Sequence, residues 1–248
     1  MTGDRRTLAT ALIWGALTHG SFAVGAGLMV WHMFHGMQAT WGAVPWPFAA
    51  LANLVLLAQF PAIHSLLLTT KGRKVLGLMA PGEHGRTLSP STYVIASSVS
   101  LALLFAFWTP SGVVLYRADG WLFWALTASY AASWGLVAKS IWDAGAGLQS
   151  GWIGWTALAK GHAPRYPDLP THGMFRLTRQ PIYLSFALTL WTPPVMSADQ
   201  LALAVAWTAY CVLSPRLKER RFERLYGERW AAYRDRTPYW LPFPRRSR

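Results

Sequence analysis

The sequence predicts an all-α protein, a polytopic transmembrane bundle of about six spans that ends in a helical hairpin and a cytoplasmic amphipathic helix. Apolar residues make up 53% of the 248 residues, and charged residues make up only 13%, about half the share usual in soluble proteins. The charges also leave long gaps, at residues 7–70, 87–116, 120–138 and, apart from Asp199, 180–215. These features exclude a soluble enzyme and a disordered protein, and the single cysteine, Cys211, excludes a disulfide scaffold.

The predicted spans follow the uncharged stretches, and each is roughly 17–25 residues long, as a helical crossing requires. We expect them at about 8–33, 46–68, 90–108, 121–142, 180–196 and 199–215. Tryptophans gather near their ends, as in the aromatic belts of membrane proteins: Trp41, Trp46, Trp108, Trp121 and Trp142. Pro61 and the pair Pro193-Pro194 are expected to kink the spans that contain or adjoin them.

The net charge of +13 is distributed as the positive-inside rule requires, which favours a membrane protein over a nucleic-acid-binding one. The N-terminus, the successive connections and the C-terminal tail carry 2, 0, 4, 1, 5, 0 and 11 Lys and Arg residues in turn. This alternation predicts an integral inner-membrane protein with both termini in the cytoplasm. Membrane lipid is therefore an expected partner, and nucleic acid is not.

The last two spans are matched in length and form the predicted hairpin, 180–215. Pro181–Met196 would rise about 24 Å as a helix and Asp199–Pro215 about 26 Å, with a short turn at Ser197-Ala198 between them. Pro181 suits the first helical turn, where its missing N–H costs little. The hairpin should bring residues 179–183 and 216–223 to one cytoplasmic level.

Residues 216–236 predict a single amphipathic helix that lies on anionic lipid. Its apolar residues recur at three- and four-residue spacing: Phe222, Leu225, Tyr226, Trp230 and Tyr233. Residues 237–244, with three prolines, should end the helix and pack as a cap.

The histidines do not predict a metal site. His32 and His35 share a helix face, but they fall at a span end, where a solvated histidine is ordinary, and no paired histidine motif accompanies them. Asp143, at the cytoplasmic end of the fourth span, could line a pocket, but a solvated carboxylate is the expectation. Phosphate-binding glycine loops and dinucleotide fingerprints are absent from the sequence.

The most specific pattern lies in the last third of the chain. Residues 173–183 read Gly-Met-Phe-Arg-Leu-Thr-Arg-Gln-Pro-Ile-Tyr, and Lys218, Glu219, Glu223, Gly227, Tyr233 and Pro238 follow beyond the hairpin. This pattern resembles the membrane methyltransferases related to isoprenylcysteine carboxyl methyltransferase and phospholipid methyltransferase. Within them it is most similar to bacterial methanethiol S-methyltransferases and NnrU-like proteins, and weaker similarities extend the resemblance over about residues 50–243.

The resemblance implies transfer of a methyl group from S-adenosylmethionine to a thiol, methanethiol-like or otherwise lipophilic, at the cytoplasmic side of the membrane. It implies a single integral membrane domain, 1–248, with N-terminal spans in 1–89 and a catalytic core in 90–248. Arg179, Gln180 and Tyr183 are the implied catalytic residues. The implied cofactor-binding residues are Arg179, Pro181, Tyr183, Glu219 and Glu223, and no metal is implied. Each charged residue has a structural alternative: Arg179 as a membrane anchor, Glu219 and Glu223 as compensation for the basic helix.

Two departures from the family pattern keep other functions open. Gln180 replaces the family histidine, and Ser185 replaces a glycine. Glutamine retains a hydrogen-bond donor and an acceptor but does not titrate. A non-catalytic NnrU-like membrane protein is one alternative, and a nicotinamide-dependent reductase related to sterol reductases is the other. The sequence does not predict the oligomeric state.

Overall fold

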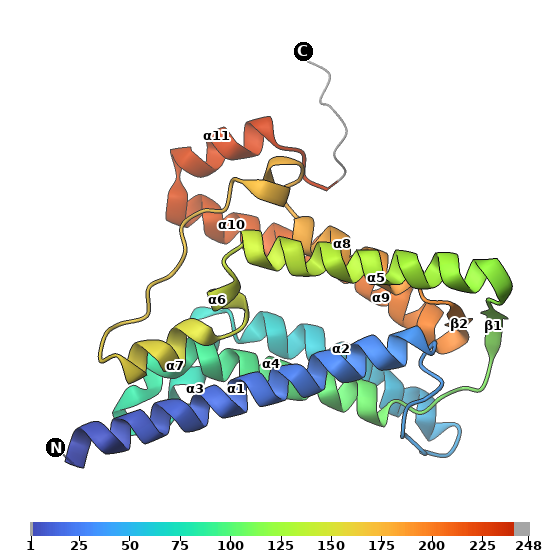
Figure 1. Cartoon of the computed structure of the whole chain (residues 1–248), viewed down its shortest axis with the longest axis horizontal. Coiled ribbons are helices and arrows are strands. Elements are labelled where there is room, and N and C mark those ends of the chain that lie inside the picture. The colour runs from blue at the N-terminus through green and yellow to red at the C-terminus, as the bar shows by residue number, and fades with distance from the viewer. Residues whose placement is uncertain (1, 241–248) are drawn as a thin grey trace. The chain divides into compact units, whose positions relative to one another are not determined.

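Helices form most of the chain in this computed structural model, which describes residues 2–240 (Figure 1). The described residues divide into two compact units. Unit 1 comprises 2–33, 37–111 and 147–166, and unit 2 comprises 34–36, 112–146 and 167–240. The predicted single membrane domain, with its boundary at residues 89 and 90, stays a prediction.

Unit 1 is built around α4 (Gly85–Phe107), against which α2 (Phe48–Leu66), α3 (Thr70–Met79) and α7 (Trp152–Ala159) pack. Its remaining elements are α1 (Thr2–Phe34), the 3-10 turn η1 (Gly82–His84) and α6 (Ala146–Gln149). Polar side chains fasten the helices to α4 and its C-terminal end. Trp14 Nε1 donates to Thr92 Oγ1 at 3.0 Å, and the Asn53 amide exchanges two hydrogen bonds with the backbone of Thr109.

Three helices of unit 1 are long and apolar enough to cross a membrane: Arg5–Phe34 within α1, Phe48–Leu66, and Gly82–Phe107 over η1 and α4. Much of α2 is left exposed, and Leu51, Leu54 and Val55 are each about three-fifths exposed. Apolar surface of this kind on a helix of this length is typical of a lipid-facing helix. The protein is therefore a helical membrane protein, and the six crossings remain a prediction.

Unit 2 contains a group of packed helices and a small sheet. α5 (Gly120–Asp143) packs on α8 (Pro181–Trp191), and α8 packs on α9 (Ala198–Leu213). The remaining elements are β1 (Val114–Arg117), the 3-10 turn η2 (Gly173–Arg176), β2 (Val195–Ser197), α10 (Pro215–Tyr226) and α11 (Glu228–Arg236). Helices thus occupy every predicted crossing, with bounds close to those expected for α5 and α9.

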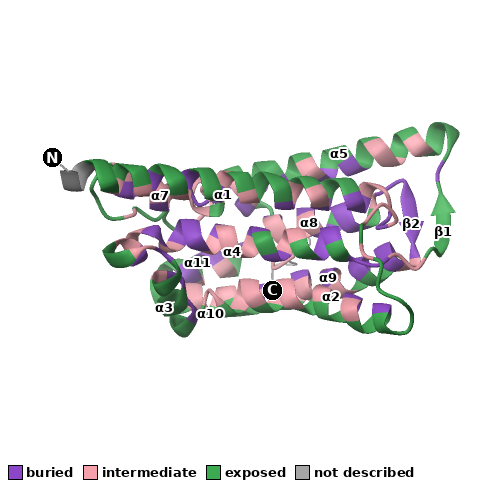
Figure 2. Cartoon of the chain, turned by 90° about the horizontal axis from the view of Figure 1, so that it is seen from below, coloured by how far each residue is buried: buried purple, intermediate pink, exposed green. Residues whose placement is uncertain are grey.

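The hairpin differs from the prediction at its turn. α8 ends at Trp191, five residues before the predicted end, because Pro193-Pro194 cannot continue the helix. The chain then forms β2, which pairs antiparallel with β1. The protein therefore contains a small two-stranded sheet in addition to the helices of the predicted all-α class. β2 is buried and β1 is exposed (Figure 2). Ser197 caps α9 by accepting from the Gln200 N–H, and its own hydroxyl donates to the Gly36 carbonyl.

The predicted helix 216–236 is divided at Gly227, whose φ of +50° and ψ of −121° suit glycine alone. The two resulting helices pack their aromatic residues inward rather than presenting one continuous apolar stripe. Trp230 and Tyr233 are buried against Phe175, and Phe222 and Tyr226 pack on the same cluster. The expected lipid-facing stripe was therefore wrong: of its five residues, only Leu225 is strongly exposed. The predicted cap lies partly outside the described residues, from 241 to 244.

Candidate functional site

Arg179 and Gln180 lie on the turn that leads from η2 into α8. Pro181 occupies the first turn of α8, as predicted, and Gln180 is its N-cap residue. The Arg179 backbone N–H donates to the carbonyl oxygen of Pro238 at 2.9 Å. This bond holds the turn to the segment that follows α11.

Glu219 binds both of these residues from α10. Its Oε1 accepts from Arg179 Nε at 2.8 Å and from Gln180 Nε2 at 2.7 Å, and its Oε2 accepts from Arg179 Nη2 at 3.3 Å. The Arg179 and Glu219 side chains are 6% and 16% exposed, so the forked ion pair is largely removed from water. The hairpin therefore brings 179–180 and 219 together.

Most of the hydrogen-bonding capacity of Arg179 is used inside unit 2. Besides its two bonds to Glu219, its Nη1 donates to the carbonyl oxygens of Arg234 at 2.8 Å and Thr237 at 3.0 Å. Its guanidinium also lies 5.9 Å from the Trp230 ring centroid and 5.5 Å from that of Tyr239. Four of its five N–H donors are thereby engaged. Arg179 is a clamp that joins the turn before α8 to α10 and α11.

Gln180 is fully buried and keeps one side-chain atom unused. Its Nε2 faces Glu219, whose carboxylate can only accept, so the orientation of the amide is fixed. The other atom, Oε1, is buried and has no hydrogen-bond partner among the residues that the structure describes. A buried acceptor without a donor costs about 1–3 kcal/mol, so this atom marks a place for a donor group from outside the chain.

Tyr183 and Lys218 face each other beside this clamp. Lys218 Nζ lies 5.5 Å from the Tyr183 ring centroid on α8 and 5.6 Å from the Phe222 ring centroid on its own helix. It also donates to the Arg179 carbonyl oxygen at 3.4 Å. The ammonium thus lies between two aromatic faces, at the turn that holds Arg179 and Gln180.

The surroundings of Lys218 disfavour its charged form. Burial lowers the pKa of the Lys218 amine to about 7, the Glu219 carboxylate opposes this shift, and the positive charges of Arg221 and Arg179 add to it. An amine with this pKa carries a proton on about half of the molecules near neutral pH. Such a group can both accept and donate a proton under physiological conditions.

Glu223 lies outside this arrangement. Its Oε1 accepts from Arg234 Nη1 at 3.1 Å, and its side chain is 59% exposed. An ion pair this exposed contributes about 0–1 kcal/mol to the free energy of unfolding. The structure thus brings Arg179, Gln180 and Glu219 into one hydrogen-bonded group, with Tyr183 beside it, and gives Glu223 a separate surface partner.

Asp143 is buried and paired, so the expectation of a solvated carboxylate was wrong. Its oxygens accept from Lys139 Nζ at 2.5 and 2.6 Å, and Oδ2 also accepts from the Met174 backbone N–H at 2.8 Å. The approach depends on Gly173, which has a φ of +58° and whose Cβ, if present, would collide with the carboxylate. These contacts hold η2 to the end of α5.

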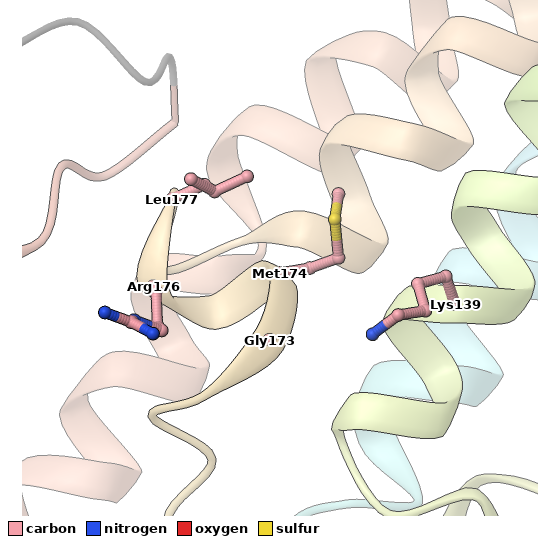
Figure 3. Close-up of a pocket in the computed structure, with 5 residues that line it drawn as sticks. All are labelled: Lys139, Gly173, Met174, Arg176 and Leu177. Carbon is pink, nitrogen blue, oxygen red and sulfur yellow. The ribbon is translucent and has the colours of Figure 1, made fainter.

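An open pocket lies at this junction, between α5 and η2 (Figure 3). It has a volume of about 590 Å³ and is lined by Lys139, Gly173, Met174, Arg176 and Leu177. In Figure 3 the Lys139 side chain extends from α5 toward the turn that carries the other four residues. Pockets for small molecules commonly measure about 300–1,000 Å³. Because Lys139 is already paired with Asp143, Arg176 is the lining residue whose charge favours an anionic group on the ligand.

Sequence reasoning placed Lys218 in the family pattern but gave it no role, and it missed the pairing of Lys139 with Asp143. The adjacency of Lys218 to Glu219 gave no sign that its amine would lie between two aromatic rings. A signal for the second pair was present, since Lys139 and Asp143 are four residues apart on one helix. Among the described residues, no group of three or more His, Cys, Asp or Glu side chains is placed to hold a metal ion.

Comparison with known proteins gives similarities over most of the chain. A methanethiol S-methyltransferase 1 from Bradyrhizobium diazoefficiens is 30% identical over 198 residues, which are 79% of this chain and 68% of that protein. A methanethiol S-methyltransferase from Mycobacterium tuberculosis is 28% identical over 82% of both chains. Nurim from Xenopus laevis is 28% identical over 71% of this chain and 63% of its own. No family model matches the chain, and no solved structure matches it.

Proposed function

Because the chain belongs to the family of methanethiol S-methyltransferases, we propose that it transfers a methyl group from S-adenosylmethionine to a small lipophilic thiol. The observation that carries the proposal is the unpartnered Oε1 of Gln180. This buried acceptor belongs to the same unit as an open pocket of about 590 Å³ with the Arg176 side chain at its wall. Methanethiol-like acceptors are the first candidates.

The residues present fit the chemical groups of S-adenosylmethionine. Gln180 Oε1 would accept from an ammonium or hydroxyl group of the donor, and Arg176 would attract its carboxylate. The Tyr183 ring would face the positively charged sulfur of the donor. When bound, S-adenosylmethionine supplies a methyl group on a positively charged sulfur.

The remaining site residues act by position in this proposal. Arg179 and Glu219 fix the Gln180 amide, and the forked pair keeps its orientation without water. Pro181 starts α8 directly after this group. Glu223 contributes to cofactor binding only through the surface charge near Arg234, and we expect its effect to be small.

The chemistry requires little acid–base machinery once a thiolate is present. The charge on a thiolate and that on a sulfonium cancel as the methyl group moves, so a site that excludes water favours the transfer. Alignment of the two reactants supplies much of the remaining acceleration. The buried side chains of Arg179, Gln180 and Glu219 would form part of such a water-excluding site.

We further propose that transfer occurs at the cytoplasmic side of the inner membrane. The eleven basic residues from Arg216 onward support a cytoplasmic position for α10, which carries Glu219. The exposed apolar surface of α2 supports contact with membrane lipid, from which a lipophilic thiol could enter.

The test uses the full-length protein in detergent and S-adenosylmethionine labelled in its methyl group. We expect label to pass to methanethiol, and we expect titration calorimetry to detect binding of the donor. Protein that binds the donor but methylates no thiol or lipid would overturn the thiol assignment. Protein that binds no donor would support the NnrU-like alternative, and binding of a nicotinamide nucleotide instead would support a reductase.

A further inference from the structure

The Lys218 amine has a position that the proposed cofactor-binding groups leave unexplained. Its side chain is half-buried, lies between the rings of Tyr183 and Phe222, and donates to the carbonyl oxygen of Arg179. Its neighbour Glu219 is already occupied by Arg179 and Gln180, and no hydrogen bond joins it to Lys218 in the described residues. Lys218 is thus a cation beside the site without a carboxylate of its own.

We propose that Lys218 is the base that deprotonates the thiol and then holds the thiolate as an ion pair. This inference rests on the proposed methyl transfer. The aromatic faces of Tyr183 and Phe222 would admit the apolar part of a small thiol, and the amine between them would meet its sulfur. The residue at 180, which is glutamine, does not titrate and cannot serve as this base.

The step balances as a proton transfer followed by a displacement. The neutral Lys218 Nζ accepts the proton of the S–H group, which leaves an ammonium beside a thiolate. The thiolate sulfur forms a bond to the methyl carbon, and the electron pair of the breaking carbon–sulfur bond stays on the sulfur of the donor. The products are a methyl thioether and neutral S-adenosylhomocysteine, and Lys218 returns its proton to water.

Three charged residues around Lys218 change the pKa of its amine. Arg179, on the turn before α8, and Arg221, on α10, disfavour the protonated amine, and Glu219 favours it. Tyr183 on α8 contributes its ring face. Burial is the largest cause of the low pKa, these charges modify it, and together they give a pKa of about 7, which leaves a neutral amine available at physiological pH.

The first experiment compares Lys218→Met and Lys218→Arg with the wild type across about pH 6–9, the range that brackets the lysine titration. For the wild type, kcat/KM with methanethiol should rise to a plateau above about pH 7. In Lys218→Met, kcat/KM should be about a hundredfold lower at pH 7 than in the wild type. It should then rise continuously with pH toward the pKa of the free thiol. Lys218→Arg should keep part of the wild-type kcat/KM because it retains the positive charge. Its pH profile should lack the plateau above about pH 7, because the guanidinium stays protonated.

The acidity of the thiol provides a second, independent variable. An aromatic thiol ionises more readily than an alkanethiol and needs less help from a base. We therefore expect Lys218→Met to recover most of its activity with an aromatic thiol. An equal loss with both thiols would overturn the proposal, because it would indicate a structural defect.

A third measurement does not depend on turnover. Acetic anhydride reacts with neutral amines, so mass spectrometry of briefly treated protein should find Lys218 labelled at pH 7.5 and protected by an excess of the methyl thioether product, which has no S–H group to consume the reagent. Arg220→Met, which removes an exposed charge from the same helix, should leave rate and pH profile unchanged. An inactive wild type would refute the proposed function. An active wild type with unlabelled Lys218, or with a pH profile shared by Lys218→Met, would refute this inference alone.

Discussion

The side chains of Gln180 and Glu219 are joined by a 2.7 Å hydrogen bond from Nε2 to Oε1, which turns the carbonyl end of the Gln180 amide away from the carboxylate. The family residue at this position, a histidine by resemblance, would offer one ring nitrogen to Glu219 and the other to a ligand. Glutamine retains the same two-sided arrangement without a titratable group. The replacement is therefore compatible with cofactor binding.

Gln180→Leu should weaken binding of S-adenosylmethionine about tenfold, because it removes the buried acceptor at Oε1. Gln180→His should weaken binding less, since one ring nitrogen can still face Glu219. Titration calorimetry on both variants in detergent measures the difference. Equal affinity in the leucine variant and the wild type would contradict a role for Gln180 in the site.

Glu219→Gln should destabilise the protein by about 1.5–3 kcal/mol, because it leaves the Arg179 guanidinium without its charged partner in a buried site. Glu223→Gln is the matched control, the same change one turn further along α10. Its exposed pair with Arg234 predicts an effect within about 0.5 kcal/mol. Thermal unfolding in detergent compares the two, and similar losses would show that the Arg179 clamp contributes no more than a surface pair.

Gly173→Ala should disrupt the junction of η2 and α5. The new Cβ would meet the Asp143 carboxylate, in addition to the cost of a positive φ for alanine, about 1–2 kcal/mol. Gly161→Ala is the control, since it has a φ of +66° with no atom within 4 Å of the new Cβ. We expect Gly173→Ala to lower the melting temperature more than the control and also to weaken donor binding. Indistinguishable variants would indicate that the Asp143 contact is dispensable.

The wild-type protein should become more stable as the pH rises from about 7 toward 9. The pKa of Lys218 lies below its ordinary value in the folded state, so the unfolded chain binds more protons in this window and raising the pH favours folding. Lys218→Met should lose this part of the pH dependence. Melting temperatures of both proteins over this range provide the measurement, and parallel curves would exclude a depressed pKa at Lys218.

The distribution of basic residues predicts the orientation of the chain in the membrane. A reporter active only in the cytoplasm should be active when fused after Arg248 and inactive when inserted into the connection at 38–44, which has no Lys or Arg. The opposite pattern would overturn the predicted topology.

Hydrophobic patterning was sufficient to locate the helices and, through the matched hairpin, to place Arg179 near Glu219. It was insufficient wherever tertiary contacts decide the structure. The apolar spacing of Phe222, Trp230 and Tyr233 predicted a lipid-facing stripe, but Gly227 redirects the chain and the stripe packs inward on Phe175. The pairing of β2 with β1 depends on residues about 80 positions apart, which no local pattern reports.

Phe34–Gly36 belong to unit 2 although the chain on both sides of them belongs to unit 1. The Gly36 carbonyl accepts from the Ser197 hydroxyl, so a contact of the first connection, between α1 and α2, forms only after a residue 161 positions later has been made. During synthesis at the ribosome, unit 1 has all its segments once residue 166 has emerged, whereas unit 2, which begins at residue 34, still needs the segment that starts at residue 167. The hairpin that follows Arg179 is therefore made only after every segment of unit 1 has been synthesised.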